Sequence, residues 1–185
     1  MTESPAGALD FAGHILILSG PPGAGKTTLA RALAALPGST KAHLHADDFW
    51  HAIKHGAIAP FLPQAHAQNA AVIQALAAAA QGYAAGGLLT VVDGVIGPWF
   101  LDAFRRLAAP VHYLVLQPPL DAAIRRCRER GYGLDDADVV AGLHAQLADL
   151  GDLRAHALPT GDAAPESVLS SVVDALDSGA FVLRR

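Results

Sequence analysis

One segment near the amino terminus constrains the fold of this chain more than any other. An apolar run from Ile15 to Leu18 precedes it, and apolar residues recur at helical spacing after it, at Leu29, Leu33 and Leu36. Between them, Gly20–Thr27 reads GPPGAGKT. This sequence matches the phosphate-binding pattern G-x-x-x-x-G-K-[ST] in the context that the pattern requires, with a strand before it and a helix after it.

The residue types of this loop suit a nucleotide polyphosphate. Glycines at 20, 23 and 25 let the main chain approach phosphates closely, and free N–H groups at the start of the helix then face the anion. We expect Lys26 to reach the β- and γ-phosphates and Thr27 to hold Mg²⁺. A glycine-rich turn without a ligand is the alternative, but it needs neither Lys nor Thr at these positions. The predicted nucleotide-binding residues are Gly20, Pro21, Pro22, Gly23, Ala24, Gly25, Lys26, Thr27 and Thr28.

The composition of the chain indicates which binding partners and which cellular compartment to expect. The formal net charge is −4, and the chain has no basic stripe of the kind that nucleic-acid binders carry, beyond RRCRER near residue 125. The single cysteine, Cys127, excludes an intramolecular disulfide and indicates a reducing compartment. No run approaches the roughly 18 apolar residues of a membrane span. The first residues also lack the pattern of a signal peptide. We therefore expect a cytoplasmic protein, monomeric or homodimeric, that binds neither a membrane nor a nucleic acid.

Strand and helix patterns alternate along the chain. We expect strands at 14–18, 41–45, 88–92, 111–116 and 154–158. We expect helices at 25–36, 64–85, 99–107, 120–130, 135–150 and 165–176. Residues 51–63 indicate an irregular region or a short helix, and residues 1–12 a loose lead-in. The alternation predicts a single α/β domain over 1–185, a three-layer sandwich in which a parallel five-stranded sheet has helices on both faces.

Two neighbouring aspartates follow the second expected strand. Ligands bind at the carboxyl ends of the strands in an open parallel sheet, so this position faces the predicted phosphate site. We expect Asp47 to be the general base that accepts the proton of an attacking hydroxyl, and Asp48 to contact the substrate. The alternative is that Asp47 or Asp48 caps a helix beginning at Phe49.

A third aspartate, Asp93, ends the apolar strand at 88–92 as a Walker B carboxylate does. It predicts a ligand of Mg²⁺ beside Thr27, or a contact to the substrate, with Gly94 next to it in the substrate site. The alternative is a plain Asp-Gly turn. Because Gly94 takes the place of a second acid, the acidic pair that activates water in many motor ATPases is absent.

Four arginines gather on the expected helix 120–130, at 125, 126, 128 and 130. A spacing of four puts Arg126 and Arg130 on one face. The glycines that follow, at 131 and 133, predict that a lid of about 126–140 can move. The alternative is a solvated basic face.

The segment after Asp48 carries the residues expected to bind the phosphate acceptor. These are Phe49, Trp50, Gln68 and Asn69; the alternative is that the aromatic residues belong to the core. His51 and His55 have the spacing of metal ligands on a helix, but no cysteine accompanies them and Mg²⁺ is expected elsewhere.

Taken in order, the motifs GPPGAGKTT, HADDFW, TVVDGVIGPWFLD and LQPPLDAAIRRCRERG resemble those of small-molecule kinases of the P-loop superfamily. The pattern is most similar to chloramphenicol phosphotransferase-like and gluconate kinase-like proteins, with zeta toxins and polynucleotide kinases further off. The resemblance spans about residues 14 to 160. It implies transfer of the γ-phosphate of ATP, with Mg²⁺, to a hydroxyl of a small molecule such as an antibiotic, a sugar or a related metabolite.

The resemblance also implies roles for individual residues. Asp47 corresponds to the general base, Arg126 to an arginine that packs on adenine, and Arg130 to one that reaches the phosphates. The stretch HALPTGDAAPE resembles the segment near the adenine, which places Pro159 to Gly161 beside the base. Relatives often carry Asp-Thr-Ser where this chain has Leu158-Pro159-Thr160, so the preference for ATP over GTP stays open.

Two rival functions remain at this point. One is a nucleotide-binding switch or ATPase that acts on a partner, because P-loop folds host many functions. The other is a toxin-like kinase that acts on a nucleotide sugar. The missing second acid after Asp93 and the carboxylate of Asp47 favour a small-molecule kinase.

Overall fold

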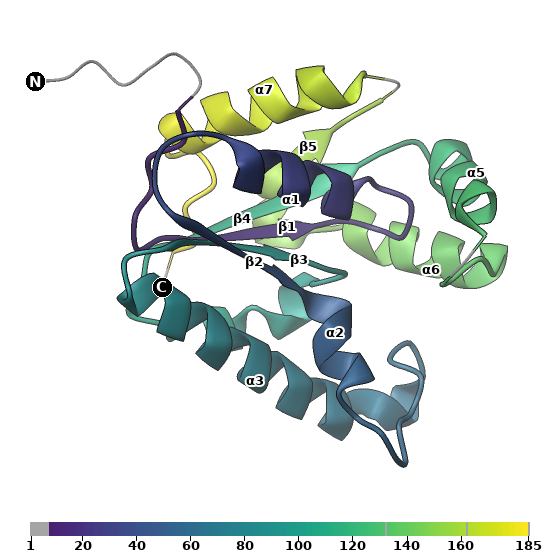
Figure 1. The fold of residues 1–185 in the computed structure, drawn as a ribbon. Coiled ribbons are helices and arrows are strands. Elements are labelled where there is room, and N and C mark those ends of the chain that lie inside the picture. Colours follow the sequence, from purple (N-terminus) through teal and green to yellow (C-terminus); the bar gives the residue numbers. More distant parts are fainter. Residues whose placement is uncertain (1–7, 132, 162, 185) are drawn as a thin grey trace, which may run out of the picture.

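The computed structural model describes residues 8–131, 133–161 and 163–184. Five parallel strands form one sheet in the order β2-β3-β1-β4-β5 (Figure 1). The strands are β1 (Ile15–Ser19), β2 (Lys41–His45), β3 (Leu89–Asp93), β4 (Val111–Gln117) and β5 (Ala157–Pro159). Because β1 lies in the middle, the glycine-rich segment that follows it lies at the centre of the carboxyl edge of the sheet.

Helices cover both faces of this sheet, as the alternation of elements predicts (Figure 1). The α-helices are α1 (Lys26–Ala35), α2 (Ala46–His51), α3 (His66–Ala85), α4 (Asp102–Arg105), α5 (Leu120–Arg130), α6 (Ala137–Ala148) and α7 (Pro165–Asp177). Short 3₁₀ helices are η1 (Pro63–Ala65), η2 (Pro98–Phe100) and η3 (Gly151–His156). Helices α1 and α7 lie side by side on one face, and α3 lies on the other.

The central strand divides its side chains between two cores. Successive residues of a strand point to opposite faces, and β1 is buried along its whole length. Ile15 and Ile17 join the core beneath α3, whereas Leu16 and Leu18 join the core beneath α1 and α7. An apolar run with no polar alternation is therefore what a central parallel strand requires.

Three elements differ from the sequence-based expectation. Helix α2 begins directly after β2, at Ala46 rather than Phe49. The expected helix at 99–107 is divided into η2 and α4, because Pro98 at the first position of η2 fixes its own backbone angle and starts a tighter turn. The last strand is shorter than expected, since η3 occupies 151–156 before β5.

The expected lead-in of 1–12 is only partly visible, since residues 1–7 lie outside the described residues. Leu9 is fully buried, and its backbone bonds to Pro37 and Ser39, so this part of the segment packs onto the domain. None of the helices in the described ranges combines the length and apolar character needed to cross a membrane.

Candidate active site

The glycine-rich loop connects β1 to α1 and is shaped by glycines with positive φ. Gly25 is the residue before α1 and has φ 86°, a left-handed angle that L residues rarely adopt. Gly20 also has positive φ, and a Cβ there would lie 2.6 Å from the carbonyl oxygen of Leu116. No side chain among the described residues caps α1. The first N–H groups of this helix are therefore available to an anion.

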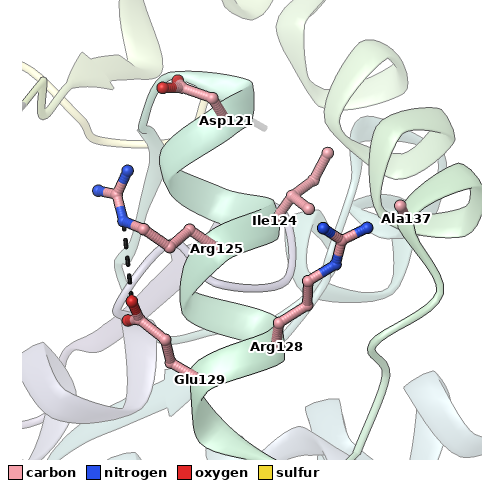
Figure 2. A pocket seen from close by; sticks show the side chains of 6 residues that line it. All are labelled: Asp121, Ile124, Arg125, Arg128, Glu129 and Ala137. Carbon is pink, nitrogen blue, oxygen red and sulfur yellow. Dashed lines mark ion pairs between the residues drawn. The ribbon is translucent and has the colours of Figure 1, made fainter.

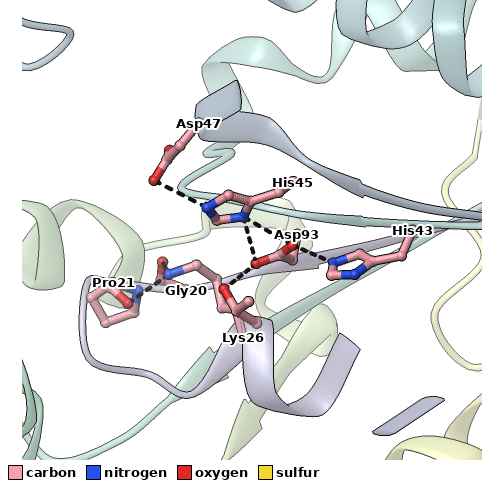
Figure 3. Close-up of polar contacts among 8 residues, drawn as sticks. Gly20, Pro21, Lys26, His43, His45, Asp47 and Asp93 are labelled. Carbon is pink, nitrogen blue, oxygen red and sulfur yellow. Dashed lines mark hydrogen bonds and ion pairs between the residues drawn. The ribbon is translucent and has the colours of Figure 1, made fainter. Parts of the chain in front are cut away.

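Lys26 folds back into this loop. Its ammonium donates to the carbonyl oxygens of Gly20 at 3.0 Å and Pro21 at 2.9 Å, and its side chain is buried (Figure 3). The ammonium thus lies inside the loop, among groups that a bound phosphate would replace as partners.

The pKa of Lys26 depends on the charged groups that lie near it. Burial lowers its pKa to about 8; the carboxylates of Asp93 and Asp47 and the thiol of Cys127 oppose this shift, and the guanidinium of Arg130 adds to it. Three residues predicted from separate segments of the sequence therefore act on one ammonium group.

Asp93 is the most heavily bonded carboxylate of the site and is fully buried. The hydroxyl of Thr27 donates to its Oδ2 at 2.5 Å, and Nε2 of His43 donates to its Oδ1 at 2.6 Å. Nδ1 of His45 lies 3.1 Å from both oxygens (Figure 3). Burial alone would raise the pKa of Asp93, but the hydrogen bonds from His43 and Thr27 and the charge of His45 together hold it below its usual value.

The two histidines on Asp93 were not among the predicted site residues. They stand at alternate positions of β2, on either side of Leu44, and therefore share one face of that strand. His45 is also the register partner of Asp93 on β3. The H-L-H pattern was visible in the sequence, but only the strand order makes β2 and β3 neighbours.

Asp47 lies in the first turn of α2. Its Oδ2 is 3.6 Å from Nε2 of His45, and its side chain is 59% exposed. His45 is the residue before the helix, so neither Asp47 nor Asp48 is its cap, and the helix does not begin at Phe49. Both acids instead lie where the helix dipole favours negative charge.

The four arginines of α5 divide into two groups. Arg130 influences Lys26, as described above, whereas Arg126 is half-buried and its predicted contact with adenine stays a prediction. Arg125 and Arg128 line a separate hollow of about 450 Å³, bordered also by Ala137 (Figure 2). There Arg125 pairs with Glu129 at 4.0 Å. Of the predicted mobile segment, Tyr132 lies outside the described residues.

A second cavity of about 310 Å³ adjoins the loop through Pro21. The other residues that line it are Gln117, Pro118, Pro119, His144, Leu147, Ala148, Pro159 and Gly161. The sequence pointed to the last two of these. Gln117 and His144 were missed, because α6 reaches this cavity only through the tertiary fold.

A family model described as an AAA domain matches residues 16–142, which is more than half of the sequence. The chain belongs to this family of P-loop domains. No curated protein matches the sequence of this AAA domain.

Solved structures share the fold of the AAA domain across nearly its whole length. A sugar kinase from Janibacter sp. HTCC2649, solved without ligand, has a TM-score of 0.69 at 20% identity, over 89% of this chain and 94% of that one. A gluconokinase from Sinorhizobium meliloti 1021 has a TM-score of 0.67 at 18% identity, over 93% and 95%. A shikimate kinase from Acinetobacter baumannii has a TM-score of 0.63 at 20% identity, over 90% and 94%. At these identities the likeness is one of fold.

Several predicted acceptor residues of the AAA domain bind the chain itself. The amide of Asn69 accepts from Nε1 of Trp50 at 2.8 Å and donates to the carbonyl of Pro60 at 2.7 Å. Gln68 bonds both backbone groups of Ile58, at 2.8 and 2.7 Å. These side chains hold the irregular loop 52–62 against α3, and their contact with an acceptor stays a prediction.

The other predicted acceptor residues lie around the start of α2. Phe49 packs against the core beneath α3, whereas Asp48 is exposed. Gly94 packs against Ala46, at the beginning of α2. Among the described residues no group of three His, Cys, Asp or Glu could hold a metal ion.

The donor set at the end of the loop fits Mg²⁺. A hydroxyl oxygen from Thr27 and a carboxylate oxygen from Asp93 are already in hydrogen-bond contact, and hard oxygen ligands are those that Mg²⁺ prefers. The low pKa of Asp93 keeps this carboxylate charged at neutral pH.

Proposed function

We propose that this AAA domain is a kinase that uses ATP and Mg²⁺ to phosphorylate a hydroxyl group of a small molecule. The observation that carries this proposal is the convergence of charges on Lys26. The ammonium of Lys26 lies inside the phosphate-binding loop, bonded to Gly20 and Pro21. The charged groups that act on it include the carboxylates of Asp93 and Asp47 and the guanidinium of Arg130. Phosphoryl transfer needs these groups: a cation site on the phosphates, a base for the attacking hydroxyl and positive charge for the transition state.

Each group has a distinct task in this reaction. Lys26 and the backbone N–H groups of the loop bind the phosphates, and Arg130 meets the charge that develops on the transferred group. Asp47 accepts the proton of the acceptor hydroxyl as the new O–P bond forms; the bond from the γ-phosphorus to the oxygen that bridges it to the β-phosphate breaks, and ADP leaves. The exposure of Asp47 leaves it accessible to a substrate. Thr27 and Asp93 would hold Mg²⁺, which supplies neutralisation of the phosphate charge.

The cavity beside Pro21 is our candidate for the nucleobase site. Its volume of about 310 Å³ lies at the lower end of ligand pockets, which suits one aromatic base. Pro159 and Gly161 border it, and Arg126 is the predicted partner for the face of adenine. ATP is the proposed nucleotide because the chain is a P-loop domain and because its motifs resemble those of small-molecule kinases that use ATP.

The names of these structural neighbours also support a small hydroxylated acceptor. The rival switch or ATPase lacks support in the loop after β3, where Gly94 stands in place of a second acid. A kinase of a nucleotide sugar uses the same groups and differs only in its acceptor.

The test is acceptor-dependent release of ADP. A panel of hydroxyl compounds is added to wild type with Mg²⁺ and ATP, and the rate above the acceptor-free background is measured. D47N should reduce the stimulated rate by about 10²- to 10⁴-fold, because it removes the proton acceptor, while ATP binding persists. D102N, at an exposed aspartate of α4, is the matched control and should behave as wild type. The absence of stimulation across a broad panel would overturn the proposal.

A further inference from the structure

Asp93 receives hydrogen bonds from three directions. Thr27 approaches Oδ2 from α1, and His43 approaches Oδ1 from β2, so each of these donors serves a different oxygen. His45 lies at equal distances, 3.1 Å, from both oxygens. The terminal torsion of an aspartate is otherwise broad, and three donors of this kind leave the carboxylate one orientation.

The histidines are not core residues that happen to touch a carboxylate. The side chain of His43 is 20% exposed and that of His45 is 35% exposed. Leu44, between them, packs instead against the core beneath α3. Stability of β2 alone would not require imidazoles at these two positions, because the strand is anchored by Leu44 and by its pairing with β3.

His45 also links the two carboxylates of the site. Its Nδ1 faces Asp93 and its Nε2 faces Asp47 at 3.6 Å (Figure 3). One ring therefore joins the residue proposed for the cation to the residue proposed as the base.

We propose that His43 and His45 are positioning residues for the cation end of this site. They hold the Asp93 carboxylate in the orientation that meets Thr27, and they thereby set the affinity of the nucleotide-bound domain for Mg²⁺. This inference rests on the proposed function, in which Thr27 and Asp93 hold that cation.

The experiment measures binding and needs no acceptor. Isothermal titration with the non-hydrolysable analogue AMP-PNP is carried out in EDTA and in excess Mg²⁺, and the ratio of the two affinities gives the coupling to the cation. H43F and H45L remove the donors with little change of shape. We expect each to lower the coupling by about 10- to 100-fold, the usual effect of losing a residue that orients a metal ligand. Affinity in EDTA should stay within about twofold of wild type.

Conservative variants distinguish the loss of a hydrogen-bond donor to Asp93 from a change in side-chain volume. The amide of H43Q can take the place of Nε2, and that of H45N can take the place of Nδ1, so both should recover most of the coupling. H55Q, at an exposed histidine of the neighbouring loop, is the control and should match wild type. A merely structural role predicts instead that both affinities fall together with the melting temperature. If H43F or H45L does not fold, H43A and H45A remove the same donors with smaller side chains.

D93N distinguishes this inference from the proposed function. If D93N retains the full coupling, the cation role assigned to Asp93 is wrong. If D93N loses the coupling while H43F and H45L keep it, the inference about the histidines is overturned and the proposed function stands.

Discussion

A pair of histidines at the amino end of the sheet, opposite the candidate site, should make the stability of this fold depend on pH. Nδ1 of His14 and Nε2 of His112 lie 2.9 Å apart in hydrogen-bond contact, and their rings stack with centroids 5.3 Å apart. Phe11 packs its ring edge-on against both. His112 is only 2% exposed, and its Nδ1 has no partner among the described residues. In this contact one imidazole nitrogen donates and the other accepts. At most one of the two rings can therefore be protonated to its charged form.

The direction of the effect follows from the pKa of His112. Burial, and then the neighbouring His14, lowers it from 6.5 to about 4. Below pH 6.5 the unfolded chain therefore binds a proton that the folded chain does not, and stability falls as the pH drops from about 6.5 towards 4. The lowered pKa of His112 costs the fold about 3 kcal/mol when the effect is complete, and about 2 kcal/mol at pH 5.

Urea unfolding at pH 8 and pH 5 tests this value. Wild type should lose about 2 kcal/mol more free energy of unfolding between the two pH values than H112Q, in which the titrating group is absent. Titrating groups distant from His112 contribute equally to both proteins and cancel in the difference. H66Q, at an exposed histidine, should follow wild type. Equal losses for wild type and H112Q would refute the reasoning, because they would mean that His112 titrates alike in the folded and unfolded chains.

Two further predictions concern the phosphate site. Because the pKa of Lys26 is lowered to about 8 and bound phosphate favours its charged form, ATP affinity should fall by up to about tenfold per pH unit above pH 8. Titration calorimetry should show proton uptake there, and K26Q should bind weakly without this dependence. R130A should lower the acceptor-dependent turnover by about 10³-fold with little change in ATP affinity, whereas R126A should raise the KM for ATP first. R128A, from the same helix, is the control. Equal turnover in R130A and R128A at saturating substrates would indicate that Arg130 is part of a solvated basic face and has no role in transfer.

The fold could be predicted from the sequence because local patterns, such as apolar runs and turn residues, agree with the overall arrangement of strands and helices. A strand–loop–helix junction explains several sequence features together. These are the apolar run of β1, the loop glycines, and the lysine and threonine that follow them. The same agreement gave α5 its bounds at Leu120 and Arg130, since Pro119 precedes it and Gly131, with φ 69°, follows it.

The arrangement around Asp93 could not be predicted in the same way. Its partners depend on β2 being the neighbour of β3, and strand order is a tertiary property that periodicity does not reveal. Likewise, the amides of Gln68 and Asn69 were expected to meet a substrate, but the loop they hold, 52–62, has no periodic pattern from which its path could be derived.

Gly94 lies where the end of β3 meets the start of α2, and a side chain there would press on Ala46. Its φ is not positive, so the requirement for glycine is steric: a methyl group there would overlap that of Ala46, the first residue of α2, by about 1 Å. G94A should therefore displace the start of α2 and Asp47 with it. A misplacement of about 1 Å can cost about 10²-fold in rate, so acceptor-dependent turnover should fall by that factor while ATP affinity persists. The double variant A46G/G94A removes the overlapping methyl group and should recover most of the turnover. Wild-type turnover in G94A, or no recovery in the double variant, would show that contact with Gly94 does not position Asp47.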